Sequence, residues 1–124
     1  MVMKQGITGP ALVSPKTIRN IIVRVVQVPK LQSESVNYSF DFTSRLNVGE
    51  TITASSVTAT VYTGVDASPA SIISGSSTIS GSIVTQLIIA GVAGVIYELL
   101  CTAVTSAGQT LKLSAYLAVI PDLQ

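Results

Sequence analysis

The sequence predicts an all-β protein, an antiparallel β-sandwich of about seven strands that follows an extended N-terminal arm. Hydrophobic residues make up 48% of the 124 residues and charged residues only 10%, and Thr, Ser, Val and Ile are abundant, as is typical of pleated sheets. Apolar and polar side chains alternate with a period of two over several segments, which are separated by turns rich in Gly, Ser and Pro. No segment has helical periodicity. The length suits one domain.

The clearest element is the last hairpin, which spans Gly91–Ile120 and turns at Ser106-Ala107-Gly108. Gly94 followed by Tyr97 matches the position of a tyrosine corner, in which a buried ring returns its hydroxyl to the backbone. The alternative is that Tyr97 is only a core side chain. We therefore expect an immunoglobulin-like (Ig-like) sandwich in which Gly94, Tyr97 and Gly108 are structural residues.

The rest of the chain divides into an arm over residues 1–16 and the sandwich domain over residues 17–124. Glycines and prolines in the arm argue against a core of its own. Thr17–Val28 is expected to form one strand or a pair of short strands that is apolar on both faces, and such a strand is normally covered on both. The other expected strands are Val36–Phe42, Thr51–Thr63, a short edge strand within Gly64–Ser82, and Ser82–Ala90. Pro29–Glu34 is expected to be a loop and Asn47–Glu50 a turn.

Several short motifs resemble, in their order, those of small tailed-bacteriophage virion structural proteins with a C-terminal Ig-like domain. They are Tyr38-Ser39-Phe40-Asp41-Phe42, Leu46 with Gly49-Glu50-Thr51-Ile52, Ser55–Ala59, and Gly94-x-x-Tyr97 with Val104–Thr110. The resemblance covers Val36–Ile120 and contains no catalytic signature. The chain departs from the usual pattern because it has no Trp and a very apolar last strand. The resemblance implies a capsid decoration or cement protein, assembled in the host cytoplasm and placed on the capsid surface or in the head–tail region.

Charge is unevenly distributed, although the net charge is only +1. Five cations precede the first acidic residue, Glu34, so that the first 33 residues carry +5 and the remainder −4: Lys4, Lys16, Arg19, Arg24 and Lys30. This asymmetry predicts a basic segment that binds an acidic surface on the major capsid protein, another virion protein or another copy of the chain. The alternative is that the cations only keep an apolar segment soluble. Nucleic acid is disfavoured, because no aromatic residue precedes Tyr38 for base stacking.

The last hairpin is apolar on both faces, and only one of them can face the core. The face opposite Tyr97 carries three interface candidates, Ile96, Leu100 and Tyr116. Monomeric proteins rarely leave a large apolar patch uncovered, so we expect an oligomer or a bound partner. The Thr17–Val28 strand either joins its own sheet or, as we favour, the sheet of a neighbouring copy.

The composition argues against catalysis, cofactors and membrane insertion. The chain has no His and a single Cys, which removes the usual nucleophilic triads and the commonest zinc ligand. Cys101 is expected to be an inert core residue. The longest apolar run, Leu87–Tyr97, has 11 residues, whereas a membrane helix needs about 20. We therefore expect no enzyme, no bound metal and no cofactor.

Two functions remain. The favoured one is a capsid decoration or cement protein that attaches to the shell or to neighbouring subunits through its basic N-terminal segment. The alternative is an Ig-like head, neck or tail appendage that adheres to the host cell surface or its glycans. Aromatic residues are absent from Gly64–Ser82, and this favours decoration over adhesion.

Overall fold

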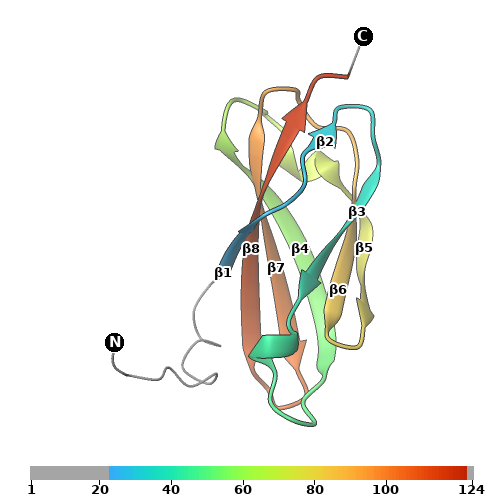
Figure 1. The fold of residues 1–124 in the computed structure, drawn as a ribbon, viewed down its shortest axis with the longest axis vertical. Helices are drawn as coiled ribbons and strands as arrows, with labels where there is room; N and C mark the ends of the chain where they lie inside the picture. Colours follow the sequence, from blue (N-terminus) through green and yellow to red (C-terminus); the bar gives the residue numbers. More distant parts are fainter. Residues whose placement is uncertain (1–22, 123–124) are drawn as a thin grey trace, which may run out of the picture.

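The computed structural model describes residues 23–122 and shows two β-sheets packed face to face (Figure 1). The expected arm and the first part of the Thr17–Val28 strand lie outside the described residues. The elements in chain order are β1 (Val23–Val26), β2 (Lys30–Leu31), β3 (Val36–Asp41), the 3-10 helix η1 (Thr43–Arg45), β4 (Ile52–Thr63), the 3-10 helix η2 (Pro69–Ile72), β5 (Ile73–Ser80), β6 (Ile83–Ile88), β7 (Ile96–Thr105) and β8 (Thr110–Ile120). None of residues 23–122 forms an α-helix. The predicted all-β sandwich is confirmed.

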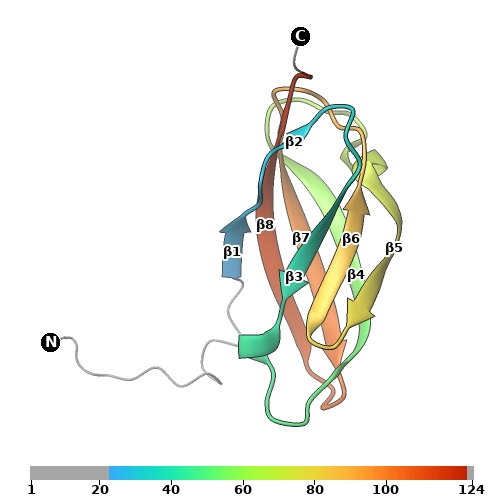
Figure 2. The ribbon, with the colours of Figure 1, turned by 45° about the vertical axis from the view of Figure 1, so that its right-hand side comes forward.

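One sheet has the strand order β1-β8-β7-β4, with β2 also paired to β8, and the other has the order β3-β6-β5. Figure 2 shows β1 and β8 at one side of the sandwich and β5 at the other. Strands β1 and β2 run parallel to β8, whereas the other pairs are antiparallel. The predicted antiparallel arrangement therefore has an exception at this edge, where the first and last strands of the described domain meet.

The last hairpin forms as predicted from β7 and β8. Tyr97 pairs with Leu117, and the turn is closed by a hydrogen bond from the Thr105 amide to the Gln109 carbonyl of 2.8 Å. Gly108 in this turn has a φ of 78°, in the region that glycine adopts at little cost. Strand β7 also pairs with β4 from Ile52 to Thr63, which places β7 inside the sheet.

The first strand differs from the expectation that it joins a neighbour. Strand β1 pairs with β8 of its own chain, with Val23 opposite Leu113 and Val26 opposite Tyr116. The Gln27 amide continues this pairing by donating to the Tyr116 carbonyl at 2.9 Å. The edge of β8 that does not pair with β7 is thereby paired within one chain, which removes a reactive sheet edge.

Two segments expected to be mostly irregular form strands. Strand β2 lies within the predicted Pro29–Glu34 loop, and β5 has eight residues where a short edge strand was expected. Gly and Ser have low strand propensity, but pairing with a neighbouring strand can override propensity. Strand β5 pairs with β6 on both sides of a register shift between Ser74 and Thr78.

The core lies between the sheets and is built from alternate residues of each strand. The inward side chains of β7 and β8 are buried: Tyr97, Leu99, Cys101, Ala103, Leu111, Leu113, Ala115, Leu117 and Val119. From the other sheet Phe40, Val84 and Ile88 meet them. Cys101 is a free, buried cysteine, as expected, and burial raises the pKa of its thiol to about 12.

We predict that Cys101 makes the fold less stable at alkaline pH. Its pKa is higher in the folded chain than its ordinary value of 9.0, so the unfolded chain loses the proton first. The free energy of unfolding should therefore fall between pH 9 and about 12, by up to about 1.4 kcal/mol per pH unit. Denaturant titrations of the wild type and Cys101→Ala between pH 8 and 10 measure this slope. The difference between the two proteins removes the contribution of tyrosine ionisation to the pH dependence. Equal pH slopes for the two proteins would contradict the prediction.

Candidate functional site

Tyr97 anchors the start of β7 to the loop that precedes it. Its side chain is fully buried, and its hydroxyl accepts a hydrogen bond from the Val92 amide at 2.9 Å and donates one to Asp66 Oδ2 at 2.6 Å. Burial and the hydrogen bond to Asp66 raise the pKa of Tyr97. The bond to a backbone amide five residues upstream is the arrangement of a tyrosine corner.

The loop between β6 and β7 is held in place around this ring. Gly94 has a φ of 89°, and its amide donates to the Val119 carbonyl at 2.8 Å. The Val119 amide in turn donates to the Val95 carbonyl at 3.0 Å. The loop is thus tied to β8 as well as to Tyr97, and it fixes where β7 begins.

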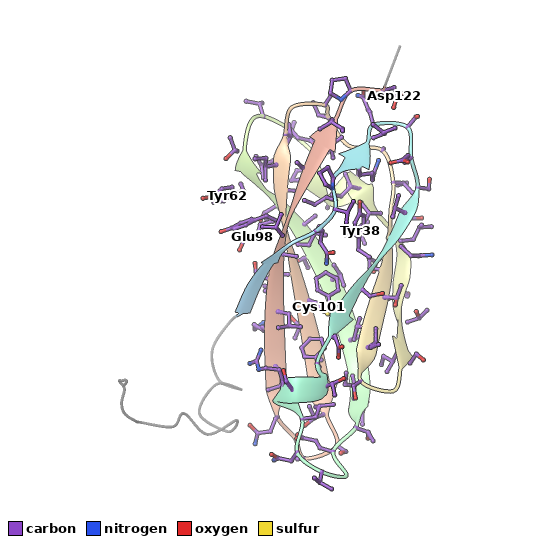
Figure 3. The ribbon with its side chains drawn as sticks, viewed as in Figure 1. Tyr38, Tyr62, Glu98, Cys101 and Asp122 are labelled. Atoms are coloured by element: carbon purple, nitrogen blue, oxygen red, sulfur yellow. The ribbon has the colours of Figure 1, made fainter. Side chains whose placement is uncertain are left out.

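One surface of the sandwich carries the three apolar residues that the sequence singled out. Ile96 and Leu100 of β7 and Tyr116 of β8 all lie half-buried on the side of the five-stranded sheet that faces away from the core. We call this surface the outer face and define it by five side chains: Tyr62, Ile96, Glu98, Leu100 and Tyr116. Figure 3 shows Tyr62 and Glu98 on that side of the sheet, and Cys101 between the sheets.

The outer face contains an aromatic pair. The rings of Tyr62 and Tyr116 have centroids 4.4 Å apart and are tilted by 37°, a close contact just below the range of about 4.5–7 Å that is typical of aromatic pairs. Tyr62 is 57% exposed. Because Tyr62 comes from β4 and Tyr116 from β8, the pair spans β7, which lies between these strands. Sequence reasoning missed Tyr62, since its proximity to Tyr116 depends on the strand order.

Polar groups surround the aromatic pair. Glu98 lies opposite Thr60 on one neighbouring strand and opposite Tyr116 on the other, and its Oε2 accepts a hydrogen bond of 2.7 Å from the Ser114 hydroxyl. Ser114 is almost fully buried. The outer face therefore combines exposed and half-buried aromatic and aliphatic groups with a carboxylate that is held in position.

The structure describes two of the five basic residues expected to attach the protein, Arg24 and Lys30. Lys4, Lys16 and Arg19 lie outside the described residues. The backbone of Arg24 is in β1, opposite Ser114. Lys30 does not lie on the surface, which corrects the expectation that it contacts a partner.

Lys30 is buried because β2 folds against the end of β8. Its Nζ donates to the Leu31 carbonyl at 2.8 Å and to the Gln32 carbonyl at 3.2 Å. Burial lowers the pKa of Lys30, although Glu34 and Asp122 act in the opposite direction. Asp122 also accepts hydrogen bonds from the Ser33 amide and hydroxyl. The ammonium group thus stabilises a turn of its own chain.

The described residues offer no obvious site for a metal. Residues 23–122 contain no group of three or more His, Cys, Asp or Glu side chains that could hold an ion. The same part of the chain has no helix that is long and apolar enough to cross a membrane.

We predict that the hydroxyl of Tyr97 stabilises the fold. Tyr97→Phe leaves the ring in place but removes the acceptor of the Val92 amide. A buried donor without an acceptor costs about 1 to 3 kcal/mol, so the free energy of unfolding should fall by about that amount in urea titrations. Tyr62→Phe is the matched control, because its ring is more than half exposed, and we expect a change within about 0.5 kcal/mol. Equal effects of the two substitutions would contradict the role of Tyr97.

Comparison with known protein families finds one match over most of the chain. Residues 30–118 match the family described as podophage GP4 fiber-tail adaptor protein gp77. No curated protein matches the sequence. The matched residues begin at β2 and end within β8, so they contain both sheets apart from β1. The chain therefore belongs to this family of bacteriophage virion structural proteins.

Proposed function

We propose that the protein is a structural adaptor of the phage tail, which uses the outer face to bind a neighbouring virion protein. The family description names a fiber-tail adaptor, and this supports a place at the tail rather than the capsid decoration role that we favoured from the sequence. The alternative of a tail appendage that contacts the host is compatible with the same location. The family match over residues 30–118 is the observation that carries the proposal.

The position of the match on the fold supports a role for the sandwich itself. The matched residues include β4, β7 and β8 up to Ala118, and these strands supply every side chain of the outer face. The basic residues at positions 4, 16, 19 and 24 lie before the match. The part of the chain that matches the family thus contains every side chain of the outer face, whereas four of the five basic residues lie before it.

The chemistry of the outer face suits a protein partner. Protein interfaces are enriched in Tyr, and a few large side chains in their centre provide most of the binding energy. Tyr62 and Tyr116 can supply such anchors, because each offers a large apolar ring with a polar tip. Ile96 and Leu100 extend the apolar surface along β7. Glu98, held by Ser114, provides a charged group that favours a partner with a complementary cation.

The division of strands between the sheets supports the Ig-like assignment. In an Ig-like sandwich the second, fourth and fifth strands share one sheet, and the third, sixth and seventh share the other. If β3 is taken as the second strand, the observed sheets β3-β6-β5 and β8-β7-β4 have this composition. The tyrosine corner at Tyr97 then falls on the sixth strand, as it does in Ig-like domains. A rigid sandwich of this kind is a suitable spacer between two virion proteins.

Charged substitutions on the outer face should prevent incorporation into tails without unfolding the protein. In Leu100→Asp and Tyr116→Lys the new side chain points away from the core, so folding should be retained. Loss of a central interface side chain costs about 2 kcal/mol or more, so occupancy in particles should fall sharply. The measurement is quantitative mass spectrometry of particles assembled with each variant. Ile83→Asp is the matched control, because Ile83 is 37% exposed on β6 of the other sheet.

The location is tested separately by analysing isolated tails and DNA-filled heads. We expect the wild-type protein in the tail fraction. Its recovery with heads alone would contradict the adaptor role and would restore capsid decoration. Normal incorporation of both outer-face variants would show that the sheet surface is not the contact.

A further inference from the structure

We propose that β3 accepts an added strand from a neighbouring copy of the chain, and that this strand is formed by residues 17–22. Strand β3 belongs to the other sheet from the outer face, so this contact does not depend on the outer face. It rests on a cavity beside β3, on the direction of the backbone groups of β3, and on the charge and pattern of residues 17–22.

A cavity of about 290 Å³ lies between β1 and β3 and is closed at one end by η1. Val26, Phe40 and Leu113 give it apolar walls, and Ser39, Asp41 and Arg45 also line it. Val26 is 81% exposed although it is apolar. The cavity is large enough for one or two aliphatic side chains and would bury the exposed Val26 when filled.

The edge of β3 beside this cavity can form a further ladder. Strand β3 is the last strand of its sheet and pairs only with β6 among the described strands. In antiparallel pairs the backbone groups of alternate residues point to opposite edges. The Phe42 amide donates to Ser82 beyond the β6 ladder, whereas the Ser39 carbonyl accepts a bond of 3.3 Å from the Gln27 side chain on the other side. The backbone groups of Asn37, Ser39 and Asp41 therefore face the cavity edge.

Residues 17–22 have a hydrophobic pattern and a charge that suit the free edge of β3. Their sequence, Thr-Ile-Arg-Asn-Ile-Ile, places Ile18 and Ile22 on one face of an extended strand. Residues 1–22 contain three cations and no acid, whereas residues 23–122 contain four Lys or Arg and six Asp or Glu. Asp41 is exposed at the rim, and hydrogen bonds from Thr43 to its carboxylate favour the charged form. With isoleucines in the cavity, Arg19 would face outward, where it can approach Asp41 and avoid Arg45.

The direction of β1 indicates that residues 17–22 pair with β3 of a neighbouring copy and not with β3 of their own chain. Strand β1 itself borders the cavity and runs parallel to β8 from Val23 onward. Residues 17–22 of the same chain could reach Ser39 only through a reverse turn directly before Val23, and such a turn takes at least about two residues. That turn would use Ile21 and Ile22. In contrast, residues 17–22 in an extended conformation reach about 20 Å from Val23, which is enough to lie along β3 of a molecule in direct contact.

A cross-linking experiment tests this strand exchange. A photoreactive benzoylphenylalanine at position 21 of the full chain is activated in an equal mixture of isotopically heavy and light protein. We expect cross-links to residues 36–41, and we expect heavy–light pairs among them. Cross-links to β3 that join only heavy to heavy and light to light would assign the strand to its own chain and overturn the proposal. Cross-links that avoid β3 would also overturn it.

Substitution of Ser39 provides an independent test of the added strand. Ser39→Pro removes an amide from the free edge only, and proline is tolerated on edge strands in this orientation. Ser39→Ala is the matched control, because it retains the amide and both variants lose the Ser39 contact with Thr85. We expect Ser39→Pro to weaken self-association, measured by analytical ultracentrifugation, by about tenfold or more, which corresponds to about 1.4 kcal/mol, and Ser39→Ala to leave it unchanged. Far-ultraviolet circular dichroism verifies the fold. Equal association constants for two folded variants, or a monomeric wild type, would refute the proposal.

Discussion

Strand β7 is the element on which the rest of the structure depends. It pairs with β4 on one side and with β8 on the other, and its inward residues from Tyr97 to Ala103 are fully buried. Because side chains alternate across a strand, burial of this set forces Ile96, Glu98 and Leu100 onto the opposite surface. The contribution of β7 to the outer face is thus a direct consequence of how β7 fills the core.

The two surfaces proposed for contacts differ in their physical basis. The outer face offers side chains, in particular the Tyr62 and Tyr116 pair, and would select a partner by shape and chemistry. The free edge of β3 offers backbone groups beside a cavity, and would accept any extended segment with suitable apolar residues. A protein with both kinds of surface can bind copies of itself along an edge while it presents a specific face to a different virion protein.

The sequence was sufficient to predict the features that depend on local pattern. The alternation in the last hairpin, the turn at Gly108 and the burial of Cys101 all follow from the period of two and from turn chemistry. The features that could not be predicted from the sequence depend on strand order. Tyr62 meets Tyr116 only because β4 and β8 flank β7, and Lys30 is buried only because β2 folds against the end of β8. A lysine in a loop flanked by Pro29 and Glu34 carries no local signal of burial.

The central claim is that the outer face is covered by another protein in the assembled particle. The four tyrosines permit a direct measurement, because Tyr38 and Tyr97 are buried in the isolated chain whereas Tyr62 is exposed and Tyr116 half-buried. Hydroxyl-radical footprinting with mass spectrometry would compare each tyrosine in free protein and in intact virions. We expect Tyr62 and Tyr116 to be oxidised in the free protein and protected in virions, with Tyr38 and Tyr97 unreactive in both. Equal oxidation of Tyr62 and Tyr116 in the two states would contradict the account.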